Sequence, residues 1–394
     1  MGRAAQLPRQ QLADAGGNGH WTSIDAHPAF MQARRPRRSA AVACGINPCR
    51  VVVRLQAGRS LRSETFNQYK GILMIRALPL ALLSAATLAL PPASAAAESV
   101  WPDKPITLIV PFPAGGGTDL VVRTLQPALT RQLQQTVIIQ NAGGAGGTVG
   151  TSQAARAKPD GYTAVAVTTS TVALSASLYK NLPYKPGQDF DYIGFIGTSP
   201  YVLAAQPALN ATTLPTLIAV LKGRSVTYAS VGAGTVSHLL GEMFKKDQHL
   251  DLTHVPYRGA APAYTDLIGG QVDIMFDNPV GLAPFVQSGK LVAVATTSAT
   301  PILPNVPTFA AQGLPAYTQS LWYGLAFPKG TPPTIVQKMN LALNTVLRDP
   351  AIAEDLAAKG VDVRLDTADA LAHTVSHDLA FWGDLITTLG VQFD

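Results

Sequence analysis

From Trp101 to the end of the chain, short apolar runs alternate with segments whose apolar residues recur every three or four positions. The short runs are typical of buried strands, and the longer segments have the period of amphipathic helices. The expected strands are residues 107–110, 137–140, 163–168, 192–196, 201–205, 226–228, 274–276, 291–296 and 323–327. The clearest helices are residues 235–246, 262–269, 333–348 and 368–389. This alternation predicts an α/β fold with largely parallel sheets.

The first expected strand runs directly into a glycine loop, within the sequence ITLIVPFPAGGGTDL at residues 106–120. A helix is expected to begin at Thr118 or Asp119, and Pro127 is expected to kink it or end it early. The first turn of a helix has unpaired amides and the positive end of the dipole, and glycine lets a ligand come close to them. The loop therefore favours a site for a carboxylate or phosphate. A tight turn that binds no ligand is the alternative.

Other polar or glycine-rich turns also follow expected strands. They are residues 141–148, 168–171, 230–235 and 257–260, and Asp277 with Asn278 follows the strand at 274–276. In open α/β sheets, ligands bind beyond the carboxyl ends of the strands. We therefore expect these turns to line one polar cleft.

The formal net charge of +6 is unevenly distributed along the chain. Ten arginines and one lysine against three acidic residues give residues 1–73 a net charge of +8, and Arg76 adds one more, so residues 77–394 carry −3. This distribution argues against nucleic-acid binding by the body of the protein. Both cysteines, Cys44 and Cys49, also lie in the first 73 residues, so the remaining chain has no disulfide, thiol nucleophile or cysteine metal site.

Residues 74–97 have the three parts of a secretory signal peptide: a positive charge at Arg76, an apolar run at 77–90, and a small-residue segment before the cleavage site. The apolar run is too short to span a bilayer comfortably. Because a signal peptide works at the start of a chain, Met74 is the expected true start, and residues 1–73 an over-extended, disordered gene start. The mature protein is expected in the periplasm. The basic cluster at residues 34–38 leaves two other interpretations of this region, a twin-arginine export signal or a polybasic binding patch.

Enzyme and cofactor motifs are missing from the sequence. None of the glycine loops matches G-x-G-x-x-G, and there is no P-loop, G-x-S-x-G elbow or H-E-x-x-H helix. His373 and His377 are four residues apart on an expected helix, but no third ligand is placed to complete a metal site. We therefore expect no catalytic residues, no metal and no cofactor.

Several motifs resemble a known family. They are Trp101-Pro102 with Pro105-Ile106, the loops at 111–119 and 143–150, the KPDGY segment at 158–162, residues 254–259 leading into 266–277, and residues 322–324 with Thr331-Pro332. From Trp101 onward the chain resembles the Bug family of periplasmic solute-binding proteins, the TctC-like substrate-binding proteins of tripartite tricarboxylate transporters.

This resemblance implies a type II periplasmic-binding-protein fold, in which two lobes joined by crossover strands close over a ligand cleft. Lobe 1 is expected at residues 98–198 plus 323–394 and lobe 2 at 199–322, with connecting strands near 196–202 and 322–327. Family members are similar in holding a ligand carboxylate through loop amides and ordered water. Ala142 and Gly143 depart from the basic residue and proline that the family often has there, which leaves the charge and stiffness of that loop open.

The residues and the resemblance together predict an exported solute-binding protein for a di- or tricarboxylate, an acidic amino acid or an aromatic acid. Its expected partners are tripartite-type transporter subunits or a membrane sensor histidine kinase, and it is expected to be a monomer. An α/β enzyme acting on a carboxylate is the remaining alternative. The expected ligand-binding residues are Phe112, Ala114, Gly115, Gly116, Gly117, Asp119, Gly146, Thr148, Thr169, Ser170, Gly234, Thr235, Tyr257 and Asp277.

Among these residues, Phe112 is expected to supply an apolar face, and the amides of 114–117 are expected to donate to the ligand. Asp119 is expected to act as a first-turn helix residue rather than a catalytic acid. Asp277 either accepts from a ligand amine or hydroxyl or simply ends a strand.

Overall fold

The computed structural model describes residues 101–390, which belong to one compact unit, Pro91–Asp394. The over-extended start expected at residues 1–73 and the signal peptide expected at 74–97 lie outside the described residues. Within residues 101–390, no helix has the length and apolar character needed to cross a membrane.

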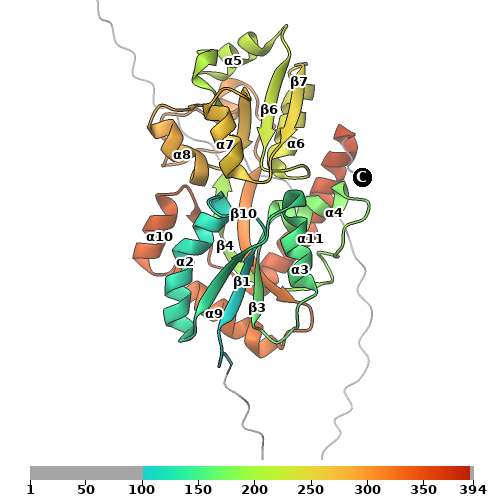
Figure 1. Cartoon of the computed structure of the whole chain (residues 1–394), viewed down its shortest axis with the longest axis vertical. Coiled ribbons are helices and arrows are strands. Elements are labelled where there is room, and N and C mark those ends of the chain that lie inside the picture. The colour runs from blue at the N-terminus through green and yellow to red at the C-terminus, as the bar shows by residue number, and fades with distance from the viewer. Residues whose placement is uncertain (1–100, 391–394) are drawn as a thin grey trace, which may run out of the picture. The chain divides into compact units, whose positions relative to one another are not determined.

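Six strands form the first sheet, in the order β11-β4-β10-β3-β1-β2. They are β1 (Ile106–Val110), β2 (Val137–Asn141), β3 (Thr163–Thr168), β4 (Phe190–Pro200), β10 (Ser320–Pro328) and β11 (Asp362–Val363). The accompanying helices are α2 (Gly117–Leu133), α3 (Thr148–Ala155), α4 (Ser175–Leu178), α9 (Pro333–Leu347), α10 (Pro350–Ala357) and α11 (Ala368–Leu389). We call this sheet and its helices lobe 1 (Figure 1).

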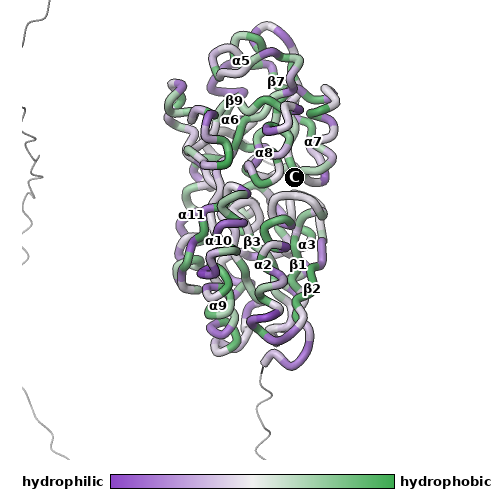
Figure 2. Tube along the Cα trace, turned by 90° about the vertical axis from the view of Figure 1, so that its left-hand side faces the viewer, coloured by the Kyte–Doolittle hydropathy of each residue, from purple (hydrophilic) through white to green (hydrophobic). Residues whose placement is uncertain are grey.

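Five strands form the second sheet, in the order β7-β6-β8-β5-β9. They are β5 (Val202–Ala205), β6 (Val226–Ser230), β7 (Leu252–Pro256), β8 (Ile274–Asp277) and β9 (Val292–Thr296). The helices around this sheet are α5 (Leu214–Leu221), α6 (Val236–Asp247), α7 (Ala260–Ile268) and α8 (Pro279–Gln287), and together they form lobe 2. Figure 2, turned by 90°, shows the same division of the elements into two lobes.

The α/β prediction is confirmed, and all nine expected strands are present, with ends that differ by up to four residues. The expectation of largely parallel sheets is wrong, because both sheets are mixed. In lobe 1, β1 pairs in parallel with β2 and β3, whereas β10 is antiparallel to both β3 and β4. In lobe 2, β6 is parallel to β7 and β8, whereas β5 is antiparallel to β8 and β9. The short strand β11 and the edge strand β7 were not predicted.

The connections between the lobes explain the mixed sheets. β4 leads out of lobe 1 into β5, and β10 returns from lobe 2, so β4 and β10 must run in opposite directions. They pair along their length, from Ser320 opposite Pro200 to Pro328 opposite Phe190. The two crossover strands therefore lie side by side, as Figure 1 shows near the middle of the view.

Helix α2 continues through Pro127 to Leu133, so the expectation that it ends early is wrong. An internal proline costs a helix about 3 kcal/mol through the lost hydrogen bond and the steric clash. Here Leu125, Leu129 and Leu133 are all buried on one face of the helix. Each such side chain contributes roughly 1.5–3 kcal/mol on burial, and together they outweigh the cost of the proline.

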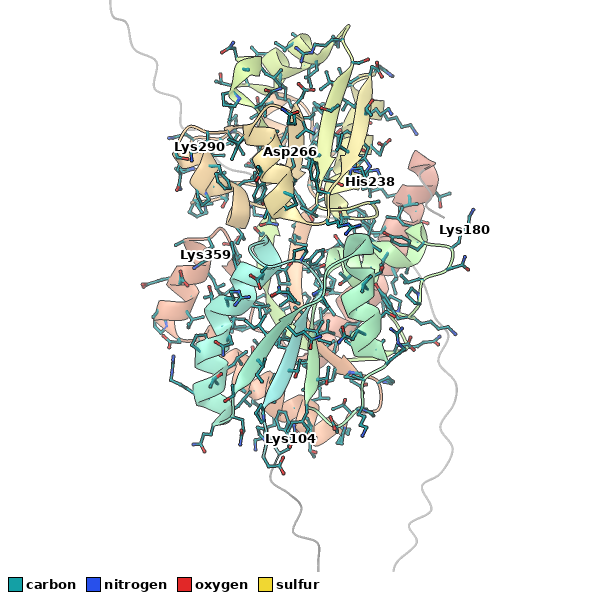
Figure 3. The ribbon with its side chains drawn as sticks, viewed as in Figure 1. Lys104, Lys180, His238, Asp266, Lys290 and Lys359 are labelled. Atoms are coloured by element: carbon teal, nitrogen blue, oxygen red, sulfur yellow. The ribbon has the colours of Figure 1, made fainter. Side chains whose placement is uncertain are left out.

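His238 lies in lobe 2, close to its boundary with lobe 1 (Figure 3), and its ring stacks on that of His254. His238 on α6 and His254 on β7 have ring centroids 3.7 Å apart and an interplanar angle of 7°. Gly234 N–H donates to His238 Nδ1 at 3.4 Å, and His254 Nε2 is hydrogen-bonded to Ser230 Oγ at 2.7 Å. Burial lowers the pKa of His238 to about 4, and burial together with the nearby His238 lowers the pKa of His254 to about 3.

These lowered pKa values predict a loss of stability in mild acid. An unfolded histidine titrates near pH 6.5, so between about pH 6.5 and 4 the unfolded chain binds more protons than the folded one. Each histidine lowers the free energy of unfolding by on the order of 3 kcal/mol over this window. Asp277, whose pKa burial raises to about 6, acts in the opposite direction by a similar amount, because the folded chain binds its proton first. We therefore expect a net fall on the order of 3 kcal/mol as the pH drops. Urea unfolding at several pH values measures this change. The double variant His238→Gln, His254→Gln should abolish this fall or reverse its sign, because Asp277 alone then acts in this window; an unchanged slope would contradict the assignment.

Candidate functional site

Two adjacent cavities lie between the lobes, and both are lined by Phe112, Pro113 and Val231. The smaller has a volume of about 40 Å³ and is also lined by Gly116, Gly117, Thr118, Thr168, Ser170, Tyr201, Ala260, Asp277, Asn278 and Leu321. The larger has a volume of about 180 Å³ and is also lined by Gly144, Ala145, Gly146, Gly147, Gly232, Ala233, Pro256, Tyr257 and Arg258. Both lobes contribute to each cavity, and together they form the interlobe cleft.

A roomier cavity, of about 630 Å³, lies within lobe 1 beside α9 and α11. Several of its polar side chains are already paired: Lys329 Nζ lies 2.7 Å from Asp191 Oδ1, and Asn340 donates to the main-chain oxygens of Ile193 and Asp366. None of the expected ligand-binding residues lines it. The candidate site is therefore the interlobe cleft.

The first turn of α2 faces the smaller cavity through Gly117 and Thr118. The helix begins after Gly116, and its first main-chain hydrogen bond joins Leu120 N–H to Gly116 O at 3.0 Å. Within the described chain, the amides of Gly117 and Thr118 have no hydrogen-bond partner. Unpaired amides at the positive end of a helix dipole form a ready site for an anion.

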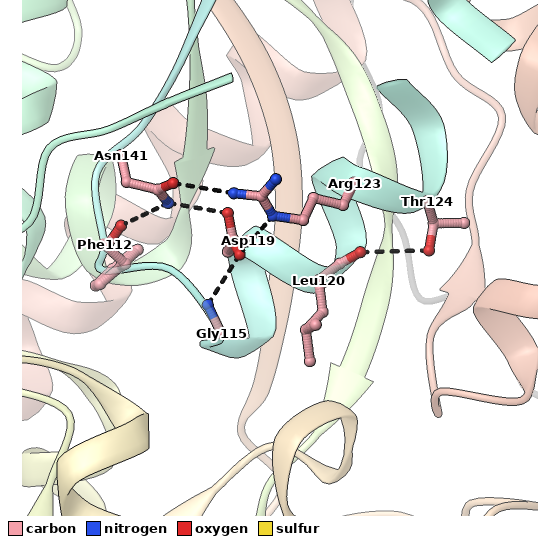
Figure 4. A network of polar contacts seen from close by, with 7 residues as sticks. All are labelled: Phe112, Gly115, Asp119, Leu120, Arg123, Thr124 and Asn141. Carbon is pink, nitrogen blue, oxygen red and sulfur yellow. Dashed lines mark hydrogen bonds and ion pairs between the residues drawn. The ribbon is translucent and has the colours of Figure 1, made fainter. Parts of the chain in front are cut away.

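Asp119 supports this turn from behind (Figure 4). Its Oδ2 accepts from Gly115 N–H at 2.9 Å and from Arg123 Nε at 2.8 Å, and its Oδ1 accepts from Asn141 Nδ2 at 2.9 Å. Asn141 also donates to Phe112 O at 3.0 Å, which ties the loop to β2. Burial raises the pKa of Asp119, but the hydrogen bonds from Arg123, Gly115 and Asn141 outweigh burial and hold the pKa below its usual value.

These bonds correct two sequence-based expectations. Asp119 is buried and fully engaged with the loop, so it orders the turn and does not line either cavity. The amide of Gly115 was expected to donate to a ligand, but it already donates to Asp119. Among the described residues, the unpaired amides of this turn are those of Gly117 and Thr118.

Asp277 and Asn278 form the opposite wall of the smaller cavity, at the end of β8. Asp277 Oδ2 accepts from Tyr264 O–H at 2.6 Å, and its Oδ1 accepts from Asn278 N–H at 2.8 Å and Asn278 Nδ2 at 3.0 Å. Burial raises the pKa of Asp277 to about 6, against the opposing effect of the hydrogen bonds from Tyr264 and Asn278. Asp277 therefore both ends its strand and faces the cleft.

Two buried polar atoms on the lining residues lack a partner. Thr168 Oγ1, at the end of β3, and Asn278 Oδ1, at the start of α8, make no hydrogen bond within the described part of the chain. Leaving a buried polar atom unpaired costs about 1–3 kcal/mol, so such atoms are uncommon. Their position around one small cavity, opposite unpaired amides, marks a place for a polar ligand group.

The larger cavity is bounded by two glycine loops, one from each lobe. Gly146, with φ +62°, faces lobe 2 so closely that a β-carbon on it would lie 2.5 Å from Ala233 O. Tyr257 O–H donates to Asp266 Oδ2 at 2.6 Å, and burial is the largest cause that raises its pKa to about 12. Arg258 lines this cavity, is exposed, and forms no ion pair with any other residue between 101 and 390.

Five further predicted residues do not line either cavity. Thr148 Oγ1 donates to Ala145 O at 2.9 Å, and Thr169 Oγ1 accepts from Trp322 N–H at 3.2 Å. Thr235 Oγ1 donates to Gly232 O at 2.8 Å, and Gly234 N–H donates to His238. These four stabilise the loops that carry the lining residues, whereas Ala114 lies in the loop before Gly115.

Direct hydrogen bonds join the lobes across the cleft. Ser170 Oγ, in lobe 1, accepts from Val236 N–H of lobe 2 at 3.2 Å. Tyr179 O–H donates to Ala233 O of lobe 2 at 2.9 Å and lies 3.3 Å from Ala145 O of its own lobe. The structure is therefore a closed arrangement of the lobes.

Several lining residues were not among those predicted. Tyr201 and Leu321 come from the crossover connections, and Ala260 opens α7. Ala260 and Asn278 lie in turns after expected strands, and this position was the available sequence signal. Tyr201 and Leu321 lie outside those turns and line the cleft because the crossover connections run past it.

Within residues 101–390 no group of three or more histidine, cysteine, aspartate or glutamate side chains is arranged to hold a metal ion. His373 and His377 both lie on α11, where His377 Nδ1 is 3.2 Å from Asp378 Oδ1.

Known proteins are similar to this chain in sequence and in fold. Residues 121–391 match the model of the tripartite tricarboxylate transporter family receptor. Protein BugT of Bordetella pertussis is 34% identical over 305 residues, which cover 76% of this chain and 94% of BugT.

Solved structures agree with the sequence match. The periplasmic binding protein BugD is 36% identical, with a TM-score of 0.71 over 74% of this chain and 99% of BugD. MatC from Rhodopseudomonas palustris, solved with bound malate, is 31% identical, with a TM-score of 0.70 over 73% of this chain and 100% of MatC. The chain belongs to the tripartite tricarboxylate transporter receptor family, the TctC- and Bug-type periplasmic solute-binding proteins.

Proposed function

We propose that this protein captures a small carboxylated metabolite in the interlobe cleft and delivers it to the membrane subunits of a tripartite tricarboxylate-type transporter. It acts as a monomeric receptor without catalysis, after export directed by the signal peptide at residues 74–97. Residues 98–198 plus 323–394 form one lobe and residues 199–322 the other. The observation that carries the proposal is the pair of unpaired α2 amides, Gly117 and Thr118, facing a closed polar cavity.

The two cavities suggest how such a ligand lies. Its carboxylate occupies the smaller cavity, where the α2 dipole and amides offset the cost of removing a charge from water. Its carbon skeleton passes Phe112, Pro113 and Val231, which line both cavities. The remaining part enters the larger cavity near Arg258, where a second anionic group finds a positive charge. A di- or tricarboxylate, an acidic amino acid or an aromatic acid fits this arrangement, and the malate in MatC supports the class.

Closure of the lobes is coupled to binding in this proposal. A ligand shifts an equilibrium only through contacts that differ between the two states. Gly117 and Thr118 belong to lobe 1, and Asp277 and Asn278 belong to lobe 2, so all four reach one ligand only when the lobes are closed. The paired crossover strands β4 and β10 supply the hinge.

Calorimetric titration tests the proposal directly. The chain is unfolded and refolded to remove bound ligand, then titrated with citrate, malate, succinate, glutamate, aspartate, nicotinate and benzoate. We expect stoichiometric binding of one of these acids, recovered chemically unchanged after incubation. Absence of binding across the panel would contradict the small-acid assignment, and turnover of the bound acid would favour an α/β enzyme instead.

The substitution Gly117→Ala separates ligand binding from folding. A β-carbon on Gly117 would lie 2.6 Å from Asn278 Oδ1 in the other lobe, so it obstructs the closed state. We expect at least tenfold weaker ligand binding in calorimetry, while thermal stability without ligand is equal or higher because alanine favours a helix over glycine. Gly187→Ala is the control, since Gly187 lines neither cavity of the cleft and a β-carbon on it would meet no atom within 4 Å. Equal affinities of the two variants would refute this assignment.

The substitution Tyr179→Phe removes one hydrogen bond between the lobes. Because a net hydrogen bond contributes about 0.5–1.5 kcal/mol, we expect affinity to fall about 2–10-fold, mainly through faster dissociation. Tyr192→Phe is the control, since Tyr192 O–H donates to Pro186 O at 2.8 Å within lobe 1. Stopped-flow measurement of ligand release should distinguish the two variants, because Tyr179→Phe should release the ligand faster and Tyr192→Phe should release it at the original rate. Tyr192→Phe should lower only the stability of the fold.

A further inference from the structure

The smaller cavity contains an acceptor that no group in residues 101–390 satisfies. Asn278 is only 5% exposed, and its Oδ1 has no hydrogen-bond partner among the described residues. Its other polar groups are engaged, because both its N–H and its Nδ2 donate to Asp277 Oδ1. This bond fixes the orientation of the amide, since Nδ2 must point to the carboxylate and Oδ1 must point away from it.

The unpaired Oδ1 points at the first turn of α2. It lies 2.6 Å from the position that a β-carbon on Gly117 would occupy, so the acceptor and the unpaired Gly117 and Thr118 amides share one small space. A carboxylate bound to those amides would present only acceptor oxygens. Two acceptors repel each other, so the carboxylate itself cannot satisfy Asn278 Oδ1.

The residues of the opposite wall give a second reason why the ligand must carry a hydrogen-bond donor. Asp277 beside Asn278 contributes further acceptor oxygens, and the residues that line the smaller cavity include no lysine, arginine or histidine. Lobe 1 thus presents the unpaired amides of Gly117 and Thr118 to this space, whereas Asp277 and Asn278 of lobe 2 present acceptor oxygens. A ligand that satisfies both walls must carry an anion and a hydrogen-bond donor close together.

The volume of the cavity limits the distance between these two groups. The smaller cavity, with a volume of about 40 Å³, has room for only one end of a ligand. It accommodates a carboxylate end and a small substituent, and the remaining skeleton must pass Phe112, Pro113 and Val231 into the larger cavity. The donor must therefore be on the carbon next to the carboxylate.

We propose that the ligand is a 2-hydroxy or 2-amino acid, and that Asn278 Oδ1 accepts a hydrogen bond from the substituent on its second carbon. The inference rests on the proposed function and narrows it, because it disfavours acids that are unsubstituted at this carbon. Such acids leave Asn278 Oδ1 buried and unpaired when the lobes close. Sites built to bond a ligand hydroxyl or amine discriminate strongly against analogues that lack it.

Matched acids that differ only at the second carbon provide the test. The full chain, refolded without ligand, is titrated with succinate, malate and aspartate, then with glutarate, 2-hydroxyglutarate and glutamate, and then with adipate and 2-aminoadipate. In each series that binds, we expect a substituted acid to bind at least tenfold more tightly than the unsubstituted one. Comparison of the hydroxy and amino acids shows which donor is preferred.

The variant Asn278→Leu assigns the discrimination to this side chain, because leucine has a similar size but no acceptor. We expect the preference for substituted acids to fall below about twofold. The control is Thr296→Val, which removes another buried, unpaired oxygen that lines neither cavity and should leave the preference unchanged. The preference is the ratio of two affinities that are measured on the same variant. A general loss of stability therefore affects the binding of both acids equally.

The possible outcomes separate the two proposals. Equal or tighter binding of the unsubstituted acids would overturn this inference and leave the carboxylate receptor intact. A preference that persists in Asn278→Leu would also overturn it, because the discrimination would then arise elsewhere. If no acid in any series binds, the proposed function itself fails.

Discussion

The first turn of α2 is the constraint on which the rest of the cleft depends. Its amides are unpaired because a helix cannot satisfy its own first N–H groups, and here a second lobe covers them. Asp119 makes this possible by accepting from Gly115, Arg123 and Asn141, which fixes the loop without occupying the cavity. The carboxylate of Asp119 thus stabilises the start of α2 without lining the cavity, and the amides of Gly117 and Thr118 stay open on the side that faces it.

The crossover strands determine how the second lobe reaches this turn. Because β4 and β10 pair antiparallel, the chain enters and leaves lobe 2 at adjacent points, and the two sheets become mixed. Closure brings Asn278 against Gly117 and brings the loop at 231–235 against Gly146. Lobe 1 offers amide donors and lobe 2 offers acceptors, so neither lobe alone forms the site. Selectivity and closure therefore depend on the same contacts.

The hydrophobic pattern was enough to predict nine of the eleven strands in the described residues and the main helices. Strand and helix periodicities are local, so nine strands and the main helices appear where the pattern predicts them, and the glycine loop before α2 is visible as a helix start with exposed amides. The motifs around residues 111–119 and 254–277 likewise indicate the family. The continuation of α2 through Pro127 was not predictable from local rules, because burial of Leu125, Leu129 and Leu133 outweighs the proline.

The tertiary structure alone decided which polar groups face the ligand and which support the loops. The sequence marks Gly115, Gly117, Thr235 and Asp277 alike as polar or glycine turn residues, yet Gly115 and Thr235 bond within their own loops, whereas Gly117 and Asp277 line the cavity. Tyr201 and Leu321 line the cleft because the crossover connections run past it. The pairing of a buried donor or acceptor depends on the position of every neighbour in space, and a one-dimensional pattern carries no information about that position.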